Sequence, residues 1–233
     1  MTVILEGKVK SIEETHDPQE ILCMFIDKVT AGNGAKEATL EGKGEVCCSI
    51  SELLFKKLED HGVDTHLLRR IDETTLLCDR VSIVPIEVVV RNKATGGLCR
   101  ETTIMEGITL QYPLIEFYLK DDAKNDPLLT KDRMALMGYS HILVDKMEAM
   151  AITTNQVLRK LFNDIGLTLV DFKLEFGFSK KTGHLLLADE LSPDGMRLWK
   201  GTTMESMDKD LFRKDKGNVV ESYQKILDDL KSL

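Results

Sequence analysis

The strongest chemical signal in the sequence is the run Leu169-Val-Asp-Phe-Lys-Leu-Glu-Phe-Gly177. Side chains alternate between the two faces of a strand, so Asp171, Lys173 and Glu175 share one face and the apolar residues share the other. The returning strand of a hairpin would bring Asp189 beside Glu175. Two neighbouring carboxylates repel each other, whereas Mg²⁺ binds one or two carboxylates together with phosphate oxygens. The hairpin therefore predicts a metal-assisted phosphate site, and a solvated, charged sheet face is the alternative.

Two further groups of charged residues could complete such a site. The turn directly after the hairpin carries Asp194 and Arg197, at the place where a site built on the hairpin's end would hold a substrate. Upstream, Glu87 and Arg91 share one face of an otherwise apolar strand that runs into a glycine-containing loop. A charged pair inside such a strand needs a partner or a ligand. An internal ion pair between Glu87 and Arg91 is the alternative.

A third group lies near the N-terminus, where Glu6, Lys8 and Lys10 would share one face of a strand predicted over residues 3–11. Two ammonium groups on one face suit polyphosphate binding, and a solvated strand is the alternative. The pattern G-x-x-x-x-G-K-[ST] is absent, so the phosphate-binding loop of the Walker A type is excluded.

The elements that position these residues are mostly strands. Runs rich in β-branched or alternating apolar residues predict strands at 3–11, 21–27, 74–78, 82–91, 167–178 and 185–190. Apolar residues at helical spacing predict helices at 45–61, at 143–165 and from residue 218 onward. This order predicts an α+β fold of two lobes, an antiparallel-sheet lobe over residues 1–80 and a larger mixed α/β lobe over residues 81–233.

Composition excludes several classes of protein. The chain has 233 residues, of which 42% are hydrophobic and 30% charged, so it is neither disordered nor fibrous. A formal net charge of −8 argues against general nucleic-acid binding. The sequence contains neither a run of about 20 apolar residues, as a membrane span needs, nor a basic-then-apolar signal peptide at its start. The five cysteines include no C-x-x-C pair, which predicts reduced thiols in the cytoplasm.

Taken together, these segments resemble the SAICAR synthetase family of purine biosynthesis. The family pattern Leu-x-Asp-x-Lys-x-Glu-Phe-Gly is matched in full at 169–177, and Val-Pro-Ile-Glu-x-x-x-Arg-x-x-x-Thr-Gly at 84–96. Three shorter patterns appear in the family's order: Gly-Lys-x-Lys at 7–10, Lys-x-Asp-Ala-x-x-Asp-Pro at 120–127 and Asp-Glu-x-Ser-Pro-Asp-x-x-Arg-x-Trp at 189–199. The resemblance therefore covers essentially the whole chain.

The resemblance implies an ATP-dependent ligase. Such an enzyme joins L-aspartate to the carboxylate of 5-amino-1-(5-phospho-D-ribosyl)imidazole-4-carboxylate through an acyl phosphate, and it gives SAICAR, ADP and phosphate. It further implies Mg²⁺, an ATP-grasp-like nucleotide cleft between the two lobes with adenine near residues 76–85, and a homodimer without nucleic-acid or membrane partners. Because a carboxylate is a poor electrophile, this chemistry needs cations and positioning rather than a covalent nucleophile.

Individual roles follow from the same resemblance. Asp171 and Lys173 would be catalytic, with Asp171 orienting groups around Lys173, and Glu175 and Asp189 would bind Mg²⁺ and nucleotide. The residues implied to hold the ATP phosphates are Lys8, Lys10 and Lys120. Those implied to hold the imidazole ribotide are Asn33, Arg91, Lys173, Asp194 and Arg197.

The sequence departs from the family pattern at two loops. Gly97 stands where the family usually has serine, and Asn33 stands where it usually has aspartate. Two other functions stay open at this point: a small-molecule kinase with a related two-lobed cleft, which would need no amine, and a nucleotide-binding module without catalysis.

Overall fold

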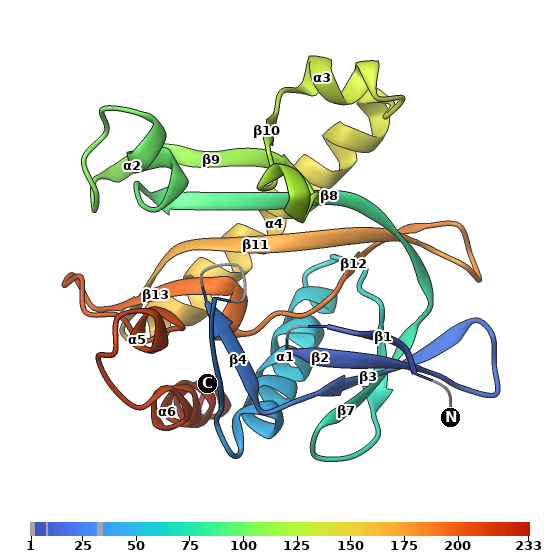
Figure 1. Cartoon of the computed structure of the whole chain (residues 1–233), viewed down its shortest axis with the longest axis horizontal. Coiled ribbons are helices and arrows are strands. Elements are labelled where there is room, and N and C mark those ends of the chain that lie inside the picture. The colour runs from blue at the N-terminus through green and yellow to red at the C-terminus, as the bar shows by residue number, and fades with distance from the viewer. Residues whose placement is uncertain (1–2, 8, 32–34) are drawn as a thin grey trace.

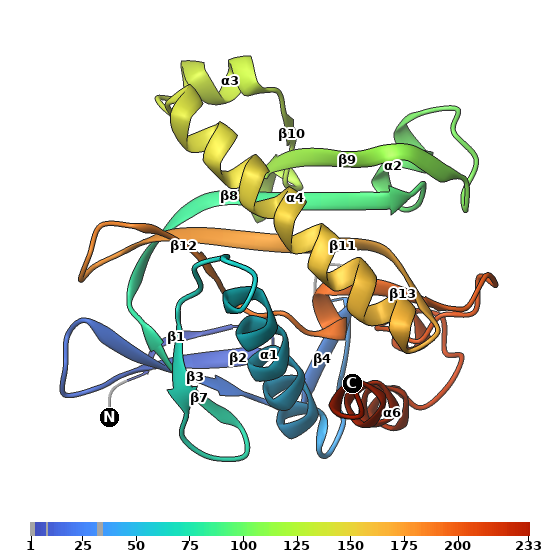
Figure 2. The same cartoon turned by 180° about the vertical axis from the view of Figure 1, so that it is seen from behind.

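Two antiparallel sheets carry most of the strands in the computed structural model, which describes residues 3–7, 9–31 and 35–233 (Figures 1 and 2). The first sheet has the order β1-β2-β3-β7-β6, with strands Val3–Glu6, Lys10–Glu14, Glu20–Phe25, Thr75–Asp79 and Leu67–Arg70. The second has the order β10-β9-β8-β11-β12, with strands Leu128–Leu129, Thr109–Leu119, Val81–Lys93, Leu167–Ser179 and Leu185–Ala188. Strand β13 (Met196–Lys200) also pairs with β11, and β4 (Lys28–Ala31) pairs with β5 (Lys36–Thr39).

Three long helices cover these sheets, and all three were predicted from the sequence. Helix α1 spans Lys43–Glu59, α4 spans His141–Asp164 and α6 spans Val219–Lys231. Figure 2 shows α4 lying across the second sheet and α1 in front of the first. The short helices are α2 (Gly97–Glu101), α3 (Lys131–Leu136), α5 (Asp210–Arg213), η1 (Asp122–Lys124) and η2 (Pro193–Gly195). One buried apolar cluster includes side chains from both sheets and from α1, α4 and α6.

The N-terminal segment differs from the prediction of a single strand over residues 3–11. The chain turns after β1, and the Gly7 N–H donates to the Lys10 carbonyl at 2.9 Å. A Cβ atom at Gly7 would meet that carbonyl oxygen at 3.0 Å, so the tight turn depends on glycine. Glu6 and Lys10 therefore lie on opposite strands of a hairpin rather than on one strand face. Lys8 lies outside the described residues.

The central hairpin confirms the predicted alternation. Phe172, Leu174 and Phe176 are buried in the core. On the other face, Asp171 and Glu175 are only 4% and 3% exposed, so the alternative of a solvated outer face is wrong. Strands β8 and β13 flank the Asp171 end of β11, and β8 and β12 flank the Glu175 end.

The backbone of His66 forms hydrogen bonds to both sheets. The backbone N–H of His66 donates to the carbonyl of Leu187 in β12 at 2.9 Å, and its carbonyl accepts from Asp79 in β7 at 2.7 Å. All strands of the first sheet end by Asp79, and those of the second begin at Val81. In the described part of the chain, no helix is both long enough and apolar enough to cross a membrane.

Glycine at position 177 allows β8 to approach β11. A Cβ atom there would lie 2.7 Å from Cγ2 and 2.8 Å from Cβ of Val81. We therefore expect Gly177→Ala to lower the free energy of unfolding by about 1–3 kcal/mol in urea denaturation, because of overpacking. Adding Val81→Ala should recover part of the loss, since the two changes share one contact.

Gly195→Ala is the matched control, because nothing lies within 4 Å of the Cβ atom that it would add. Equal destabilisation by Gly177→Ala and Gly195→Ala would contradict this account of Gly177.

Candidate functional site

One pocket of about 310 Å³ lies at the Asp171 end of β11, and we call it the arginine pocket. Its charged lining residues are Arg91, Asp171, Lys173, Asp194, Arg197 and Arg213. Four of these six side chains are cationic, although the chain as a whole is acidic. The pocket is therefore suited to an anionic ligand.

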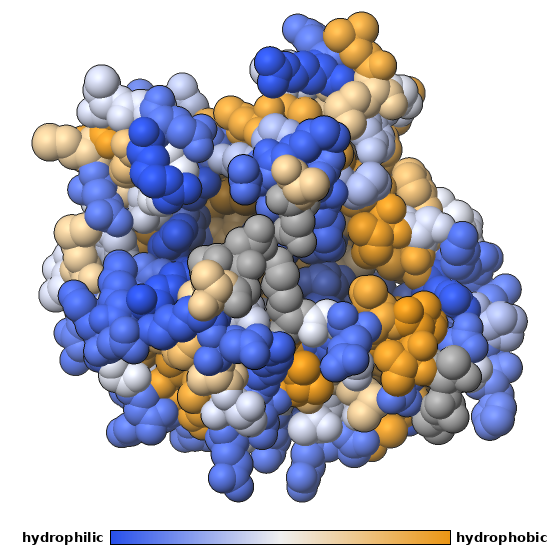
Figure 3. Space-filling view, in the orientation of Figure 1, coloured by the Kyte–Doolittle hydropathy of each residue, from blue (hydrophilic) through white to orange (hydrophobic). Residues whose placement is uncertain are grey.

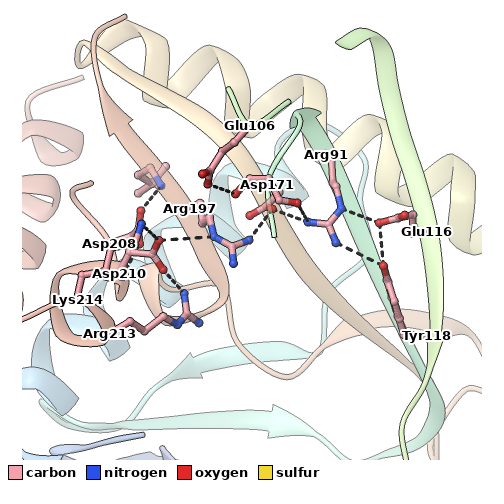
Figure 4. A network of polar contacts seen from close by, with 12 residues as sticks. Arg91, Glu106, Glu116, Tyr118, Asp171, Arg197, Asp208, Asp210, Arg213 and Lys214 are labelled. Carbon is pink, nitrogen blue, oxygen red and sulfur yellow. Dashed lines mark hydrogen bonds and ion pairs between the residues drawn. The ribbon is translucent and has the colours of Figure 1, made fainter. Parts of the chain in front are cut away.

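Asp171 is the centre of an ion-pair network in this pocket (Figure 4). Its Oδ2 atom accepts from Nη1 of Arg91 and from Nη1 of Arg197, each at 2.7 Å. Arg91 also donates from Nε to Oε2 of Glu116 at 2.6 Å. Its Nη2 atom donates to the Tyr118 hydroxyl at 3.4 Å. The guanidinium groups of Arg91 and Arg197 are thus fixed in place by buried acidic partners.

A pair of glycines lets the backbone approach these guanidinium groups. Gly96 has φ +61°, and a Cβ atom there would lie 3.2 Å from Nη1 of Arg197. At Gly97 a Cβ atom would meet Glu101 at 3.3 Å and would lie 3.8 Å from Nη2 of Arg91. Position 96 therefore requires glycine for conformation and for space, whereas position 97 has room for a small side chain.

A second layer of acidic residues supports Arg197 (Figure 4). Asp210 lies 3.9 Å from Nε of Arg197 and pairs with Arg213 at 2.6 Å and with Lys214 at 2.8 Å. Asp208 accepts the backbone N–H groups of Leu198 and Asp210, each at 2.7 Å. Burial raises the pKa of Asp208 to about 6, because the charged form loses its hydration.

A second pocket, of about 300 Å³, opens between the two sheets, and we call it the inter-sheet pocket. Its apolar lining comes from both sheets: Ile4, Leu5, Ile12, Ile21, Val81 and Ile83. Its polar lining consists of Lys10, Cys23, His66, Arg80, Lys120, Glu175 and Asp189. Figure 3 shows this side of the molecule hollowed near its middle, with hydrophilic residues to the left and hydrophobic residues to the right. The pocket thus combines an apolar slot with a charged end.

Lysines pair with both carboxylates at the charged end. Nζ of Lys10 lies 2.5 Å from Oδ1 of Asp189, and Nζ of Lys120 lies 2.5 Å from Oε2 of Glu175. Burial disfavours the charged form of Asp189, but the ammonium groups of Lys10 and Lys173 outweigh it and hold the pKa of Asp189 well below its usual range. Asp189 also has φ +65°, a conformation that a non-glycine residue adopts at a cost.

Lys173 connects the two ends of the β11 face. Its Nζ atom lies 2.9 Å from Glu87 and 3.0 Å from Oε1 of Glu175. Burial opposes its charge, yet Glu175 and its acidic neighbours raise the pKa of Lys173 above its usual value. Glu87 thus pairs with Lys173 and Arg91 pairs with Asp171, so the alternative of a Glu87–Arg91 ion pair is wrong.

Asp194 is held from behind by two residues that the sequence analysis missed. Nζ of Lys43, at the start of α1, lies 2.7 Å from Oδ2 of Asp194. The hydroxyl of Tyr223, in α6, donates to Oδ1 at 2.9 Å. Lys43 is only 1% exposed and Tyr223 is fully buried. Asp194 therefore anchors the loop after the hairpin to α1 and α6, in addition to lining the arginine pocket.

The predicted site residues thus gather in two neighbouring pockets. Lys10, Lys120, Glu175 and Asp189 line the inter-sheet pocket, whereas Arg91, Asp171, Lys173, Asp194 and Arg197 line the arginine pocket. Lys8 and Asn33 lie outside the described residues. Within the described part of the chain, no three His, Cys, Asp or Glu side chains gather into a metal site. A cation at Glu175 and Asp189 would therefore need ligand oxygens from a phosphate or from water.

The family model of SAICAR synthetase matches residues 3–230. The chain belongs to the SAICAR synthetase family. It is 48% identical to a phosphoribosylaminoimidazole-succinocarboxamide synthase of Synechococcus sp. over 96% of this chain and 91% of that protein. It is 42% identical to the one of Staphylococcus aureus over the full length of both. The predicted family is confirmed, and with it the prediction of a ligase of purine biosynthesis.

Solved structures of SAICAR synthetases share this fold. A SAICAR synthetase in complex with ADP superimposes with a TM-score of 0.94 at 37% identity, covering 98% of this chain and 97% of that one. The SAICAR synthetase of Pyrococcus horikoshii has a TM-score of 0.91 at 36% identity, covering 96% and 98%. The predicted fold class, a mixture of helices and antiparallel sheets, is confirmed.

The buried Lys43–Asp194 pair predicts a large effect on stability. Lys43→Met would leave the Asp194 carboxylate buried without its cation, so we expect a loss of about 3–5 kcal/mol in the free energy of unfolding. The control is Lys214→Met, which removes a half-exposed partner of Asp210 and should cost about 0–1 kcal/mol. Urea denaturation measures both, and similar small losses would contradict a structural role for Lys43.

Proposed function

We propose that this member of the SAICAR synthetase family joins L-aspartate to 5-amino-1-(5-phospho-D-ribosyl)imidazole-4-carboxylate, with ATP converted to ADP and phosphate. The observation that carries the proposal is the single polar face of β11, whose Glu175 lines one pocket and whose Asp171 lines the other. Two reactants held at the two ends of a rigid strand react as an oriented pair, which lowers the entropic part of the barrier.

The inter-sheet pocket is the proposed nucleotide site. Its apolar slot, with Val81 and Ile83 on one wall, suits a purine ring, and Lys10 and Lys120 suit its phosphates. The related SAICAR synthetase in complex with ADP supports nucleotide binding by this fold. On this proposal the two sheets belong to two lobes, residues 1–80 and 81–233, with an ATP-grasp-like cleft between them.

Glu175 and Asp189 fit the donor set of Mg²⁺. Both are carboxylates at the charged end of the inter-sheet pocket, and lysines already hold both in position. Two carboxylates plus phosphate oxygens form a typical magnesium environment. Bound there, the ion would supply positive charge to neutralise the transferred phosphoryl group. The chain's own contribution is to hold both carboxylates beside lysines at the charged end of the pocket.

The arginine pocket is the proposed site of the imidazole ribotide. Arg91 and Arg197 would bind the ribotide phosphate, because Asp171 fixes both guanidinium groups beside the Gly96–Gly97 backbone. Asp194 lines the same pocket and would contact the sugar or the imidazole. Asn33 is also proposed for this site by family resemblance alone.

Lys173 is the proposed catalytic cation. It lies between the two pockets and is kept protonated by Glu87 and Glu175. An ammonium group in this place would stabilise negative charge on the ribotide carboxylate while it becomes an acyl phosphate and while the aspartate amine attacks it. Asp171 would act by orienting the guanidinium groups next to Lys173.

The ATP-dependent ligase reaction has a direct test. We expect SAICAR to form only when ATP, Mg²⁺, L-aspartate and the imidazole ribotide are all present, as measured by ultraviolet absorbance. Glu175→Gln and Asp189→Asn should each lower kcat by about 100-fold or more, since each removes charge from the reacting centre. Circular dichroism should show that both variants are folded.

Glu205→Gln is the control, because Glu205 lies exposed at the surface and its change should leave kcat unaltered. Full activity of both Glu175→Gln and Asp189→Asn would disprove the proposed metal site. Phosphorylation of the ribotide without a need for aspartate would instead identify a kinase.

The glycine pair predicts opposite effects of two small changes. Gly96→Ala strains a φ of +61° and crowds Arg197, so we expect the KM for the ribotide to rise about tenfold or more. Gly97→Ser has room for its side chain and adds a hydroxyl donor, so the same KM should fall about threefold to tenfold. The KM for ATP should change in neither variant, and parallel changes in both constants would contradict the assignment.

The predicted homodimer and cytoplasmic location stay predictions. They rest on the family resemblance and on the cysteine pattern.

A further inference from the structure

One buried histidine in the inter-sheet pocket has ring nitrogens without a well-formed hydrogen bond in the described part of the chain. His66 is 2% exposed, and among the described residues neither ring nitrogen makes a hydrogen bond of good geometry; the polar group nearest in effect is the backbone of Asp189, which favours the charged form of the ring only weakly. The His66 ring packs against that of Phe55, at 5.4 Å between ring centroids and with an interplanar angle of 71°. Burying a polar group without a partner costs about 1–3 kcal/mol, so such a residue calls for an explanation.

The backbone of His66 explains the place of this residue in the fold but not its side chain. Its N–H and carbonyl tie β12 to β7, and any residue except proline could make those two hydrogen bonds. These two hydrogen bonds hold the Cα atom of His66 close to the end of β12, directly before Asp189. The ring is therefore held in the pocket wall, where its polar atoms have no well-formed hydrogen bond in the described structure.

Two groups at the charged end of the pocket, Lys10 and Asp189, act electrostatically on this ring. Burial and the charge of Lys10 lower the pKa of His66 to about 4, which keeps the ring neutral at physiological pH. A neutral imidazole carries one donor and one acceptor. Lys10 and Asp189, which act electrostatically on the ring, are also the groups that the proposed function assigns to the phosphates and the metal.

We propose that His66 is a nucleotide-binding residue, whose ring donates a hydrogen bond to an oxygen of the ribose-phosphate part of the bound nucleotide. This proposal rests on the proposed function, because it takes the inter-sheet pocket as the nucleotide site. His66 then couples the two sheets to the ligand, since its backbone joins both sheets and its side chain reaches the pocket between them.

Calorimetric titration with ADP and Mg²⁺ tests the proposal without any need for turnover. We expect His66→Phe to raise the Kd for ADP about tenfold, as the loss of one hydrogen bond to a charged group would. His66→Gln retains a donor amide and should lie within about threefold of the unsubstituted protein. His61→Phe is the matched control, because His61 is exposed just after α1, its ring Nδ1 contacts the Lys57 carbonyl at 2.7 Å, and it does not line the pocket. This control should leave the Kd unchanged.

Thermal unfolding separates this role from a structural one. His66→Phe replaces an unpartnered polar ring with an apolar ring of similar shape beside Phe55, so Tm should be unchanged or higher while ADP affinity falls. A lower Tm together with wild-type ADP affinity would overturn the proposal and leave His66 as a structural residue.

Nuclear magnetic resonance of ¹⁵N-histidine provides a readout on the unsubstituted protein. ADP should shift the ring ¹⁵N signals of His66, identified by their loss in His66→Gln, and leave those of His61 in place. Unshifted His66 signals at saturating ADP would overturn the proposed role of His66 but not the proposed nucleotide site. If the unsubstituted protein fails to bind ADP at all, the proposed nucleotide site fails with it, and the two failures are thereby distinguished.

Discussion

The arrangement of the site depends on the need to neutralise buried carboxylates on one face of β11. Asp171 and Glu175 are almost fully buried, and a buried carboxylate without a cation is strongly unfavourable. The fold supplies the cations from other elements: Arg91 from β8, Arg197 from β13 and Lys120 from the segment after β9. Because these partners come from distant parts of the sequence, the charges can pair only when the whole second sheet is assembled.

The same requirement explains which parts of the site could be predicted from the sequence. Strand alternation alone places Asp171, Lys173 and Glu175 on one face, and the hairpin brings in Asp189. Strand alternation and the hairpin turn are both local features, and the sequence shows each of them clearly. The burial of that face was not predictable, since a charged strand face is commonly solvated and only its cationic partners decide otherwise.

Contacts between residues far apart in the sequence could not be predicted. Lys43 and Tyr223 contact Asp194 from α1 and α6, and nothing in their local sequence distinguishes them from other residues of amphipathic helices. The N-terminal strand was placed wrongly because Gly7 permits a tight turn that the apolar pattern around it does not reveal. The helices α1, α4 and α6 were predicted well, because their apolar periodicity is long and each has a clear end.

Strand geometry also explains why two pockets can serve one reaction. Alternate residues on a strand face are about 7 Å apart, so Asp171 and Glu175 are separated by about 13 Å with Lys173 midway between them. On the proposed assignment, a ribotide bound by its phosphate near Asp171 extends its carboxylate toward Lys173. On the same assignment, a nucleotide bound near Glu175 would point its terminal phosphate at Lys173 from the opposite side. On that assignment, β11 would set the spacing between the two reactants, and the ion pairs along its face would keep the groups that hold them aligned.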